Sequence, residues 1–366
     1  MYIKEIELQD FRNYQSLSAE FDPRVNIFHG KNAQGKTNLL ESIYITSMGK
    51  SFRTSKDKDL IRFGADFFRV KVKAYKEDDN FIELAVNKQG KKGIKINGIK
   101  AKKISQLFEN IYIVIFSPED LRIVKDEPEK RRKFIDRELC QIRPSYYNSL
   151  NQYKKVLIQR NAYLKEPHVD PDVLDIWDSQ LAEYGSKVIL QRDVFIKKLE
   201  AISRSIHQGI TDHKESLDVS YEPSIEPCSD LNSVFYEELR KHRKRDIKNR
   251  TTGKGPHKDD LKLQIGGIDI RGFGSQGQQR TAALSLKLSE IQLIREETGE
   301  SPILLLDDVL SELDQQRQND LISSLEDTQI FITATEISPE LQRVLKHIRY
   351  FQIKNGAITK TSFAGV

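Results

Sequence analysis

The sequence predicts an α/β fold into which a mainly helical domain is inserted. Short apolar runs and alternating polar and apolar residues, both typical of strands, fill roughly the first hundred residues. From about residue 129 to residue 245, apolar residues instead recur at intervals of three and four, which indicates helices. Strand character returns after residue 260. We therefore expect a discontinuous α/β domain, residues 1–128 and 246–366, closed over a helical insertion or arm domain, residues 129–245.

Individual elements can be placed on this plan. In the first part we expect strands at residues 25–29, 67–74, 80–86 and 111–116. The pair Asn97-Gly98 is a hairpin turn signal. Prolines break the helical middle near residues 167–171 and 222–230. In the last part we expect a helix at residues 277–298 and strands at residues 261–270, 303–306 and 329–332.

The composition is that of a globular protein without a membrane span. Of the 366 residues, 38% are hydrophobic and 31% are charged, and no run of eighteen apolar residues occurs. The two cysteines, Cys140 and Cys228, lie far apart and lack the spacing of metal ligands. We therefore expect a protein of the reducing cytoplasm with no structural zinc site.

The net charge of +5 is distributed unevenly. Residues 88–103 hold seven lysines and no acid, and residues 240–258 hold nine lysines or arginines against the single acid Asp246. Such blocks suit a polyanion, although solvated loops and helix faces explain the pattern equally well. The candidate DNA-binding residues are Lys91, Lys92, Lys102, Lys103, Arg243, Lys244 and Arg245. The first block has no aromatic residue on which a base could stack, so duplex DNA or a duplex junction, bound without sequence preference, is the expected partner.

A complete P-loop pattern follows the strand expected at residues 25–29. It consists of Gly30, Lys31, Asn32, Ala33, Gln34, Gly35, Lys36 and Thr37. Backbone N–H groups of such a loop bind phosphates, Lys36 reaches the β- and γ-phosphates, and the Thr37 hydroxyl ligates Mg²⁺. A chance match is the alternative, but the expected strand before the loop and the helix after it disfavour chance. ATP and Mg²⁺ are therefore the expected ligands.

An acidic segment supplies the second half of such a site. The apolar run at residues 303–306 predicts a buried parallel strand that delivers Asp307 at its carboxyl end, where Asp307 can hold Mg²⁺. Asp308 follows and is the candidate to polarise the attacking water. Asp307, Asp308 and Lys36 are thus the candidate catalytic residues. Without the P-loop, a helix N-cap would explain the two aspartates equally well.

The signature segment, residues 274–280, resembles the signature motif of ABC-type ATPases, whose usual form is Leu-Ser-Gly-Gly-Gln. Ser275, Gly277 and Gln278 match this form, whereas Gln276 replaces the usual glycine. A hydroxyl, a glycine and the N-terminus of the following helix make a good anion site. Taken alone, a Ser-Gly-Gln cluster is more often a plain loop. The resemblance implies an ABC-type ATPase head, a mixed sheet around a P-loop core, in which this segment contacts the nucleotide of a partner chain.

Two further segments fit the same resemblance. Ser311 and Asp314 match the D-loop, which in that family crosses to the partner subunit, although an ordinary N-capped helix start is the alternative. The family's switch histidine has no counterpart after the strand at residues 329–332, and Thr335 is the candidate to replace it. The missing histidine implies slow hydrolysis.

Nearly the full chain resembles the RecF family of recombination-mediator proteins. The matching stretches are residues 8–14, the P-loop with Asn38, and residues 49–53, 116–121, 131–136, 255–261 and 305–314. The first stretch holds Arg12 and Asn13, which by resemblance to the chromosome-maintenance branch of ABC-type ATPases contact the nucleotide phosphates, although a surface turn is an equally good interpretation of that stretch alone. The resemblance implies a cytoplasmic bacterial protein of DNA repair and replication with a weak ATPase activity. It further implies an ATP-dependent homodimer on DNA that acts with RecR and RecO to load RecA at gaps.

Two other classes of protein share the P-loop and the signature. Transporter cassettes place only a small helical insertion between these motifs, whereas about 237 residues separate Thr37 from Ser275 here. A chromosome-organising protein needs long coiled-coil arms, but a helical middle of about 115 residues allows an antiparallel pair of only roughly 80 Å. An ATP-gated DNA-binding protein is the preferred interpretation. The preferred DNA structure, the hydrolysis rate and the surface that meets RecR stay open.

Overall fold

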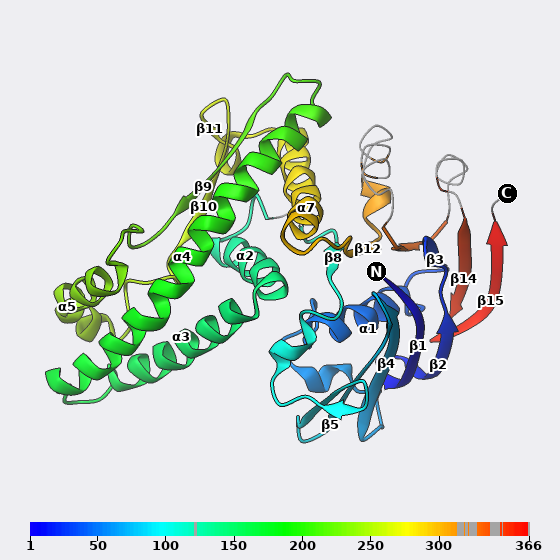
Figure 1. The fold of residues 1–366 in the computed structure, drawn as a ribbon, viewed down its shortest axis with the longest axis horizontal. Coiled ribbons are helices and arrows are strands. Elements are labelled where there is room, and N and C mark those ends of the chain that lie inside the picture. Colours follow the sequence, from blue (N-terminus) through cyan, green and yellow to red (C-terminus); the bar gives the residue numbers. More distant parts are fainter. Residues whose placement is uncertain are drawn as a thin grey trace. The chain divides into compact units, whose positions relative to one another are not determined.

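The computed structural model describes residues 1–120, 123–312, 318, 321, 328–336, 345 and 347–364, and Figure 1 colours the chain from its N-terminus to its C-terminus. The chain divides into two compact units, one formed by Met1–Leu121 with Glu290–Val366 and the other by Arg122–Ser289. The expected domain boundaries, 128/129 and 245/246, differ from these limits and stay a prediction. Among the described residues, no helix combines the length and the apolar character that a membrane span requires.

An antiparallel six-stranded sheet belongs to the first unit (Figure 1). Its strands, in sheet order, are β2 (Tyr14–Glu20), β1 (Tyr2–Phe11), β4 (Phe67–Tyr75), β5 (Asp79–Asn87), β6 (Lys92–Ile96) and β7 (Ile99–Lys100). Buried residues occupy every second position along much of β4 and β5, so one face of the sheet packs inward. The expected hairpin turn is confirmed, because Asn97 (φ 51°) and Gly98 (φ 79°) both have the left-handed backbone that a two-residue turn requires.

A mixed six-stranded sheet of the same unit carries the candidate site. Its strands, in sheet order, are β15 (Ala357–Ala364), β14 (Ile348–Lys354), β3 (Val25–His29), β13 (Ile330–Ala334), β12 (Ile303–Asp307) and β8 (Ile113–Phe116). All neighbouring pairs are parallel except β14 and β15. Every residue of β8 and β12 is buried, as in strands covered on both faces. Parallel pairing brings the carboxyl ends of β3, β13 and β12 to one edge of the sheet.

The helix after the P-loop, α1 (Lys36–Met48), is confirmed. It contacts β13 of the mixed sheet and β4 of the antiparallel sheet, which explains why ten of its residues are buried. The helix ends at Gly49, which has a left-handed backbone (φ 63°) and donates its N–H to Ile45 O at 2.8 Å. Short 3₁₀ helices among the described residues of this unit are η1 (Asp57–Leu60), η2 (Ile104–Leu107) and η4 (Val309–Glu312).

The second unit consists of helices and a small antiparallel sheet (Figure 1). Its helices are α2 (Pro128–Ile142), α3 (Pro144–Tyr163), α4 (Pro171–Ile210), α5 (Leu231–Asn249), α6 (Ile270–Phe273) and the first part of α7 (Gln276–Thr298). Its strands, in sheet order, are β11 (Ile268–Asp269), β10 (Asp260–Ile265) and β9 (Leu217–Glu222). The expected break near residues 167–171 is confirmed. The mostly helical middle is confirmed as well. Strand β9, whose six residues pair with β10, is an element within it that the sequence did not predict, because so short a run does not show its alternation clearly.

Buried ion pairs join the helices of the second unit. Arg160 on α3 is fully buried and donates to Asp178 on α4 at 2.7 Å and to Asp246 on α5 at 2.8 Å. Arg192 on α4 pairs with Asp259, next to β10, at 3.0 Å. Removing one member of such a pair would leave a buried charge without compensation, so these contacts fix the relative positions of α3, α4 and α5.

Candidate functional site

The P-loop joins β3 to α1 through two glycines in unusual conformations. Gly30 and Gly35 have φ values of 149° and 114°. A Cβ atom at Gly30 would collide with the carbonyl oxygen of Ile353, and one at Gly35 would collide with the side chain of Asn13. Close packing and backbone conformation therefore both require glycine at these two positions.

Lys36 lies at the first position of α1 and is only 4% exposed. Its Nζ donates to the carbonyl oxygens of Gly30 at 2.7 Å and Lys31 at 3.3 Å, so the ammonium group lies inside the curve of the loop. Lys31, Asn32 and Ala33 are exposed, which leaves the outside of the loop accessible. The positive end of the helix dipole adds to the lysine charge, so this end of α1 favours an anion. The contacts of the loop with phosphate stay a prediction.

Side chains from the start of α1 and from the ends of β12 and β13 meet beside the P-loop. Thr37 Oγ1 donates to Asp307 Oδ1 at 2.8 Å, although the two residues lie 270 positions apart. The Thr333 hydroxyl, on β13, donates to the same oxygen at 2.9 Å and accepts the backbone N–H of Asp308 at 2.9 Å. Burial raises the pKa of Asp307, while the hydrogen bonds from the two threonines act in the opposite direction. A hydroxyl and a carboxylate so placed fit a hard cation such as Mg²⁺.

Thr333 is a site residue that sequence reasoning missed. The sequence pointed to Thr335, which lies exposed in a bend after β13. Asp308 is half-buried and has a left-handed backbone (φ 53°), and Thr333 holds its N–H. The available signal was a polar residue near the carboxyl end of a buried strand, which is the same signal that identified Asp307. Whether Thr335 replaces the switch histidine stays a hypothesis.

The turn between β1 and β2 braces the P-loop through Asn13. Asn13 Nδ2 donates to the carbonyl oxygen of Gln34 at 3.0 Å, and Asn13 Oδ1 accepts from Asn38 Nδ2 at 2.8 Å. The neighbouring Tyr14 hydroxyl donates to the carbonyl oxygen of Gly35 at 2.9 Å. Asn13 therefore lies beside the loop, and its expected contact with phosphate stays a prediction.

Arg12 is directed toward α1 instead. Its Nε and Nη2 donate to the two carboxylate oxygens of the fully buried Glu41, each at 2.8 Å, and its Nη1 donates to the carbonyl oxygen of Asp59 at 2.9 Å. The Ser51 hydroxyl donates to the same carboxylate, and Arg53 Nη1 lies 3.5 Å from it. The expected contact of Arg12 with phosphate stays a prediction. Sequence reasoning also missed Glu41, whose signal was a lone acid within an apolar helical run.

The turn between β14 and β15 contacts the P-loop as well. The backbone N–H of Asn355 donates to Gln34 Oε1 at 2.8 Å, and that of Gly356 donates to the carbonyl oxygen of Gln34 at 3.0 Å. Both turn residues have left-handed backbones, with φ values of 51° and 71°. The pair Asn355-Gly356 is itself a hairpin signal, but nothing in the sequence indicated that this hairpin touches the loop.

The signature segment lies in the second unit, at the N-terminus of α7. Gln278 N donates to Ser275 Oγ at 3.1 Å, and Ser275 N donates to Gln278 Oε1 at 2.9 Å, which is the reciprocal arrangement of a capping box. Ser275, Gln276 and Gly277 are exposed. The start of α7 therefore presents a hydroxyl and the positive end of a helix dipole at the surface. Contact with a partner chain stays a prediction.

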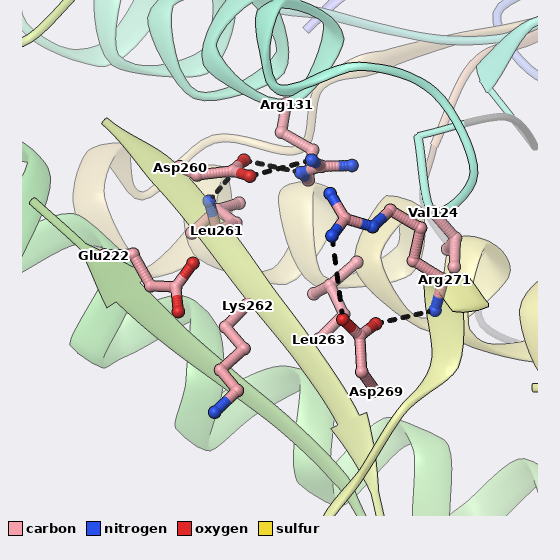
Figure 2. A pocket seen from close by; sticks show the side chains of 9 residues that line it. All are labelled: Val124, Arg131, Glu222, Asp260, Leu261, Lys262, Leu263, Asp269 and Arg271. Atoms are coloured by element: carbon pink, nitrogen blue, oxygen red, sulfur yellow. Dashed lines mark hydrogen bonds and ion pairs between the residues drawn. The ribbon is translucent and has the colours of Figure 1, made fainter. Parts of the chain in front are cut away.

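Charged residues fix the chain just before the signature segment (Figure 2). Asp269 accepts the backbone N–H of Arg271 at 2.8 Å and so caps α6, and its carboxylate lies 3.8 Å from the Arg271 guanidinium. Arg131 on α2 forms a two-point pair with Asp260 on β10, with distances of 2.6 and 2.8 Å. These side chains border a pocket of about 130 Å³. Because these charged side chains pair with one another, their presence at the pocket needs no bound ligand to account for it.

The D-loop candidates are described only in part. Ser311 belongs to η4, which follows Asp308 directly. Asp314 lies outside the described residues. The assignment of both residues to a D-loop therefore stays a prediction.

The candidate DNA-binding residues fall into two groups. Lys92 is 13% exposed and pairs with Asp57 at 2.8 Å. Arg243 is 15% exposed and pairs with Asp175 and Asp178. These internal ion pairs account for both residues without DNA. The other candidates are exposed: Lys91, Lys102, Lys103, Lys244 and Arg245.

Two solved structures resemble the chain along nearly its whole length. The structure of the recombination mediator protein RecF-ATPrS in RecFOR pathway has a TM-score of 0.91 at 40% sequence identity, and the match covers 98% of this chain and 97% of that one. The structure of RecF-ATP in the same pathway has a TM-score of 0.90 at 39% identity, and covers 100% of this chain and 98% of that one. The α/β head with mixed sheets and a helical insertion, expected from the sequence, is thereby confirmed.

Sequence comparisons agree with the structural ones. The family model described as RecF/RecN/SMC N terminal domain matches residues 2–359. The DNA replication and repair protein RecF of Clostridium novyi (strain NT) is 45% identical over 361 residues, which are 98% of this chain and 100% of that protein. The chain therefore belongs to the RecF/RecN/SMC N-terminal domain family and, within it, to the RecF proteins of DNA replication and repair.

Proposed function

We propose that the chain is an ATP-dependent DNA-binding protein of recombinational repair and replication that acts in the bacterial cytoplasm. ATP drives its dimerisation on DNA, a weak DNA-dependent ATPase activity ends that state, and with RecR and RecO the protein helps to load RecA at gaps. The observation that carries the proposal is the 2.8 Å contact between Thr37 Oγ1 and Asp307 Oδ1 beside the phosphate-binding loop. Relatives named for DNA replication and repair and for the RecFOR pathway support the biological setting.

ATP is the ligand that the loop fits best. Lys36 has two carbonyl partners that it can exchange for phosphate oxygens, and the N-terminus of α1 supplies further donors. The relatives named RecF-ATP and RecF-ATPrS support this choice. Thr37 and Asp307 are the residues that would hold Mg²⁺, which neutralises charge on phosphate oxygens.

Asp308 is the residue proposed to polarise the attacking water. The Thr333 hydroxyl fixes its backbone N–H, so its position at the edge of the sheet is constrained. Residues 329–336 contain no histidine that could assist. Slow hydrolysis follows, and it suits a switch in which the ATP-bound state has to persist on DNA.

Dimerisation would complete the nucleotide site. Each chain has a P-loop in its first unit and an exposed anion site at Ser275 in its second unit. Two copies related by a twofold axis can exchange these elements reciprocally, so that Ser275, Gln276, Gly277 and Gln278 of one chain meet the nucleotide held by Lys36 of the other. Ser311 and Asp314 would cross between the chains as a D-loop.

DNA binding is assigned to the exposed basic residues. Lys91, Lys102 and Lys103 form one group, and Lys244 and Arg245 form another. Lysines and arginines contact phosphates, which carry no base information, so binding is independent of sequence and weakens with salt. A dimer presents each group twice to one duplex, and ATP therefore tightens DNA binding without touching DNA.

Molar mass in solution tests the proposal. Light scattering with ATP, Mg²⁺ and duplex DNA is expected to find two chains per particle once the mass of the bound DNA is subtracted, whereas the nucleotide-free chain is expected to be single. A mass that ATP and DNA leave at one chain per particle would refute ATP-driven dimerisation.

A further inference from the structure

A row of polar side chains leads from the signature segment into the interior of the second unit. Gln278 Oε1 accepts the backbone N–H of Ser275 at 2.9 Å, while Gln278 Nε2 donates to Glu215 Oε1 at 2.9 Å. Glu215 lies in the turn between α4 and β9, and its side chain is 29% exposed. The amide oxygen of Gln278 thus bonds Ser275 within the signature segment, and its amide nitrogen bonds Glu215 in the turn.

The turn that carries Glu215 has a defined geometry of its own. Glu215 N donates to Thr211 Oγ1 at 3.4 Å, and Thr211 Oγ1 donates to the carbonyl oxygen of His207 at 2.8 Å. Asp212 and His213 both have left-handed backbones, with φ values of 50° and 60°. Because the turn is fixed to the end of α4, Glu215 determines where the Gln278 amide lies.

A buried histidine faces the other oxygen of this carboxylate. His207 on α4 is fully buried, and its Nε2 lies 3.5 Å from Glu215 Oε2. Its Nδ1 lies 3.0 Å from Ser285 Oγ on α7, and Ser285 Oγ donates to the carbonyl oxygen of Thr281 at 2.9 Å. Because the serine proton is used there, Nδ1 carries the proton of a neutral ring, and Nε2 is left as an acceptor that faces a carboxylate. Among the described residues, Nε2 has no hydrogen-bond partner.

We infer that Glu215 is a positioning residue for the signature segment and that the protonation of His207 sets how firmly Glu215 holds Gln278. With a neutral ring, the carboxylate bonds the Gln278 amide alone. With a protonated ring, Nε2 forms an ion pair with Glu215 Oε2 across 3.5 Å, and the carboxylate binds Gln278 less strongly. The consequence for dimerisation rests on the proposed function, because a loosened Gln278 no longer fixes Ser275 for the nucleotide of a partner chain.

The direction of the pH effect follows from the surroundings of the ring. Burial lowers the pKa of His207 from its ordinary value of 6.5, and the charge of Glu215 acts in the opposite direction. Glu215 faces the ring from the turn after α4, and α7 faces it with the Ser285 hydroxyl, which does not titrate near neutral pH. The ring is therefore neutral at neutral pH and gains its proton below pH 6.5, so the hold on Gln278 weakens as the pH falls below that value.

Three variants of the full chain separate the positioning role from a general effect of charge. Glu215→Ala removes the acceptor for Gln278. Glu215→Gln keeps an oxygen acceptor and removes the charge that faces His207. Asp212→Asn is the matched control, because it removes one negative charge from the same turn at a side chain that is 83% exposed, and asparagine tolerates the left-handed backbone.

The dimer dissociation constant with ATP, followed by light scattering between about pH 5.5 and 7.5, gives the functional readout. Glu215→Ala should weaken the dimer about tenfold and leave the affinity of the single chain for ATP unchanged. Glu215→Gln should restore most of the dimer and remove the parent's weakening below pH 6.5, and Asp212→Asn should behave as the parent. A parent-like dimer in Glu215→Ala, or the parent's pH profile in Glu215→Gln, would overturn the inference.

Hydrogen exchange without nucleotide gives a readout that does not depend on the proposed function. The amides of Ser275 and Gln278 should exchange about tenfold faster in Glu215→Ala and at the parent's rate in the other two variants. Unchanged exchange in Glu215→Ala would overturn the positioning role. A parent that neither binds ATP nor dimerises, together with faster exchange in Glu215→Ala, would refute the proposed function and support the positioning role.

Discussion

The Thr333 hydroxyl lies 2.9 Å from Asp307 Oδ1 and accepts the backbone N–H of Asp308 at 2.9 Å, so one side chain positions both acidic residues of the candidate site. Its strand, β13, lies between β3 and β12 in the mixed sheet. A side chain at the end of β13 therefore lies between the P-loop, which follows β3, and the acidic residues that end β12.

Replacing Thr333 by valine should slow ATP hydrolysis by about tenfold. The variant keeps the volume of the side chain and removes two hydrogen bonds, each worth about 1 kcal/mol. ATP affinity should change less, because Lys36 and the loop are untouched. Steady-state ATPase and nucleotide-binding assays measure the two effects. Thr335→Val is the control. If that variant hydrolysed ATP slowly while Thr333→Val hydrolysed it normally, the switch role would belong to Thr335 and not to Thr333.

Asp308→Asn should bind ATP normally, hydrolyse it at least about tenfold more slowly and accumulate as a dimer on DNA, because an amide cannot polarise water as a carboxylate does. Asp307→Asn should instead lose the Mg²⁺ dependence of binding and hydrolysis, since a hard cation prefers an anionic oxygen. Titrating Mg²⁺ in an ATPase assay distinguishes the two variants. If Asp308→Asn hydrolysed ATP at the rate of the parent, Asp308 would not be the residue that polarises the attacking water.

Local motifs were the part of the site that the sequence could predict. The P-loop, the acidic strand end and the signature each lie within a few neighbouring residues, and the structure places the P-loop and Asp307 together as expected. The contacts of Thr333, Glu41 and the turn at Asn355 join residues that are distant in sequence. No local pattern encodes such pairings, because they depend on strand order and on which face of a helix is covered.

The second unit shows the same division between local and long-range information. Its helical character was predictable from apolar spacing, and the break before α4 was predictable from its prolines. Lys92 and Arg243 looked like surface charges because charge patterning does not show whether an acid lies opposite. The sequence also gave no indication that Glu215, 63 positions before Gln278, would hold the signature segment.

Stability should decrease as the pH falls from 6.5 toward 4. Burial lowers the pKa of His257 from 6.5 to about 4, and the ring lies between the Tyr153 hydroxyl and the carbonyl oxygen of Thr252. In this window the unfolded chain binds more protons than the native one, so the free energy of unfolding falls by about 3 kcal/mol as the pH drops from 6.5 to about 4. Below that pH, this group lowers the free energy of unfolding no further. Urea unfolding at a series of pH values measures the slope of the free energy of unfolding against pH.

His257→Gln should reduce that slope without abolishing it, because burial also lowers the pKa of His207 and His29. A slope equal to that of the parent would show that His257 does not contribute.

Reversing the charge of Lys91, Lys102 and Lys103 with glutamate should weaken DNA binding and flatten its salt dependence, with ATP affinity unchanged. Each phosphate contact that is lost removes about 0.9 from the slope of log affinity against log salt on duplex DNA. Salt titrations of DNA affinity measure this for the parent and the variant. The matched variant reverses Lys244 and Arg245. Equal slopes in the parent and the first variant would assign DNA binding to another surface.

Molar mass measured by light scattering, with ATP, Mg²⁺ and duplex DNA, tests the central claim most directly. The parent should form particles with two chains, after the mass of the bound DNA is subtracted, whereas Lys36→Met should stay a single chain because it loses the phosphate contact and the charge. Ser275→Arg should also stay a single chain while it still binds ATP, since the substitution blocks only the contact with the partner's nucleotide. If Ser275→Arg formed two-chain particles with ATP as the parent does, the signature segment would not contact the partner's nucleotide and the claim would be contradicted.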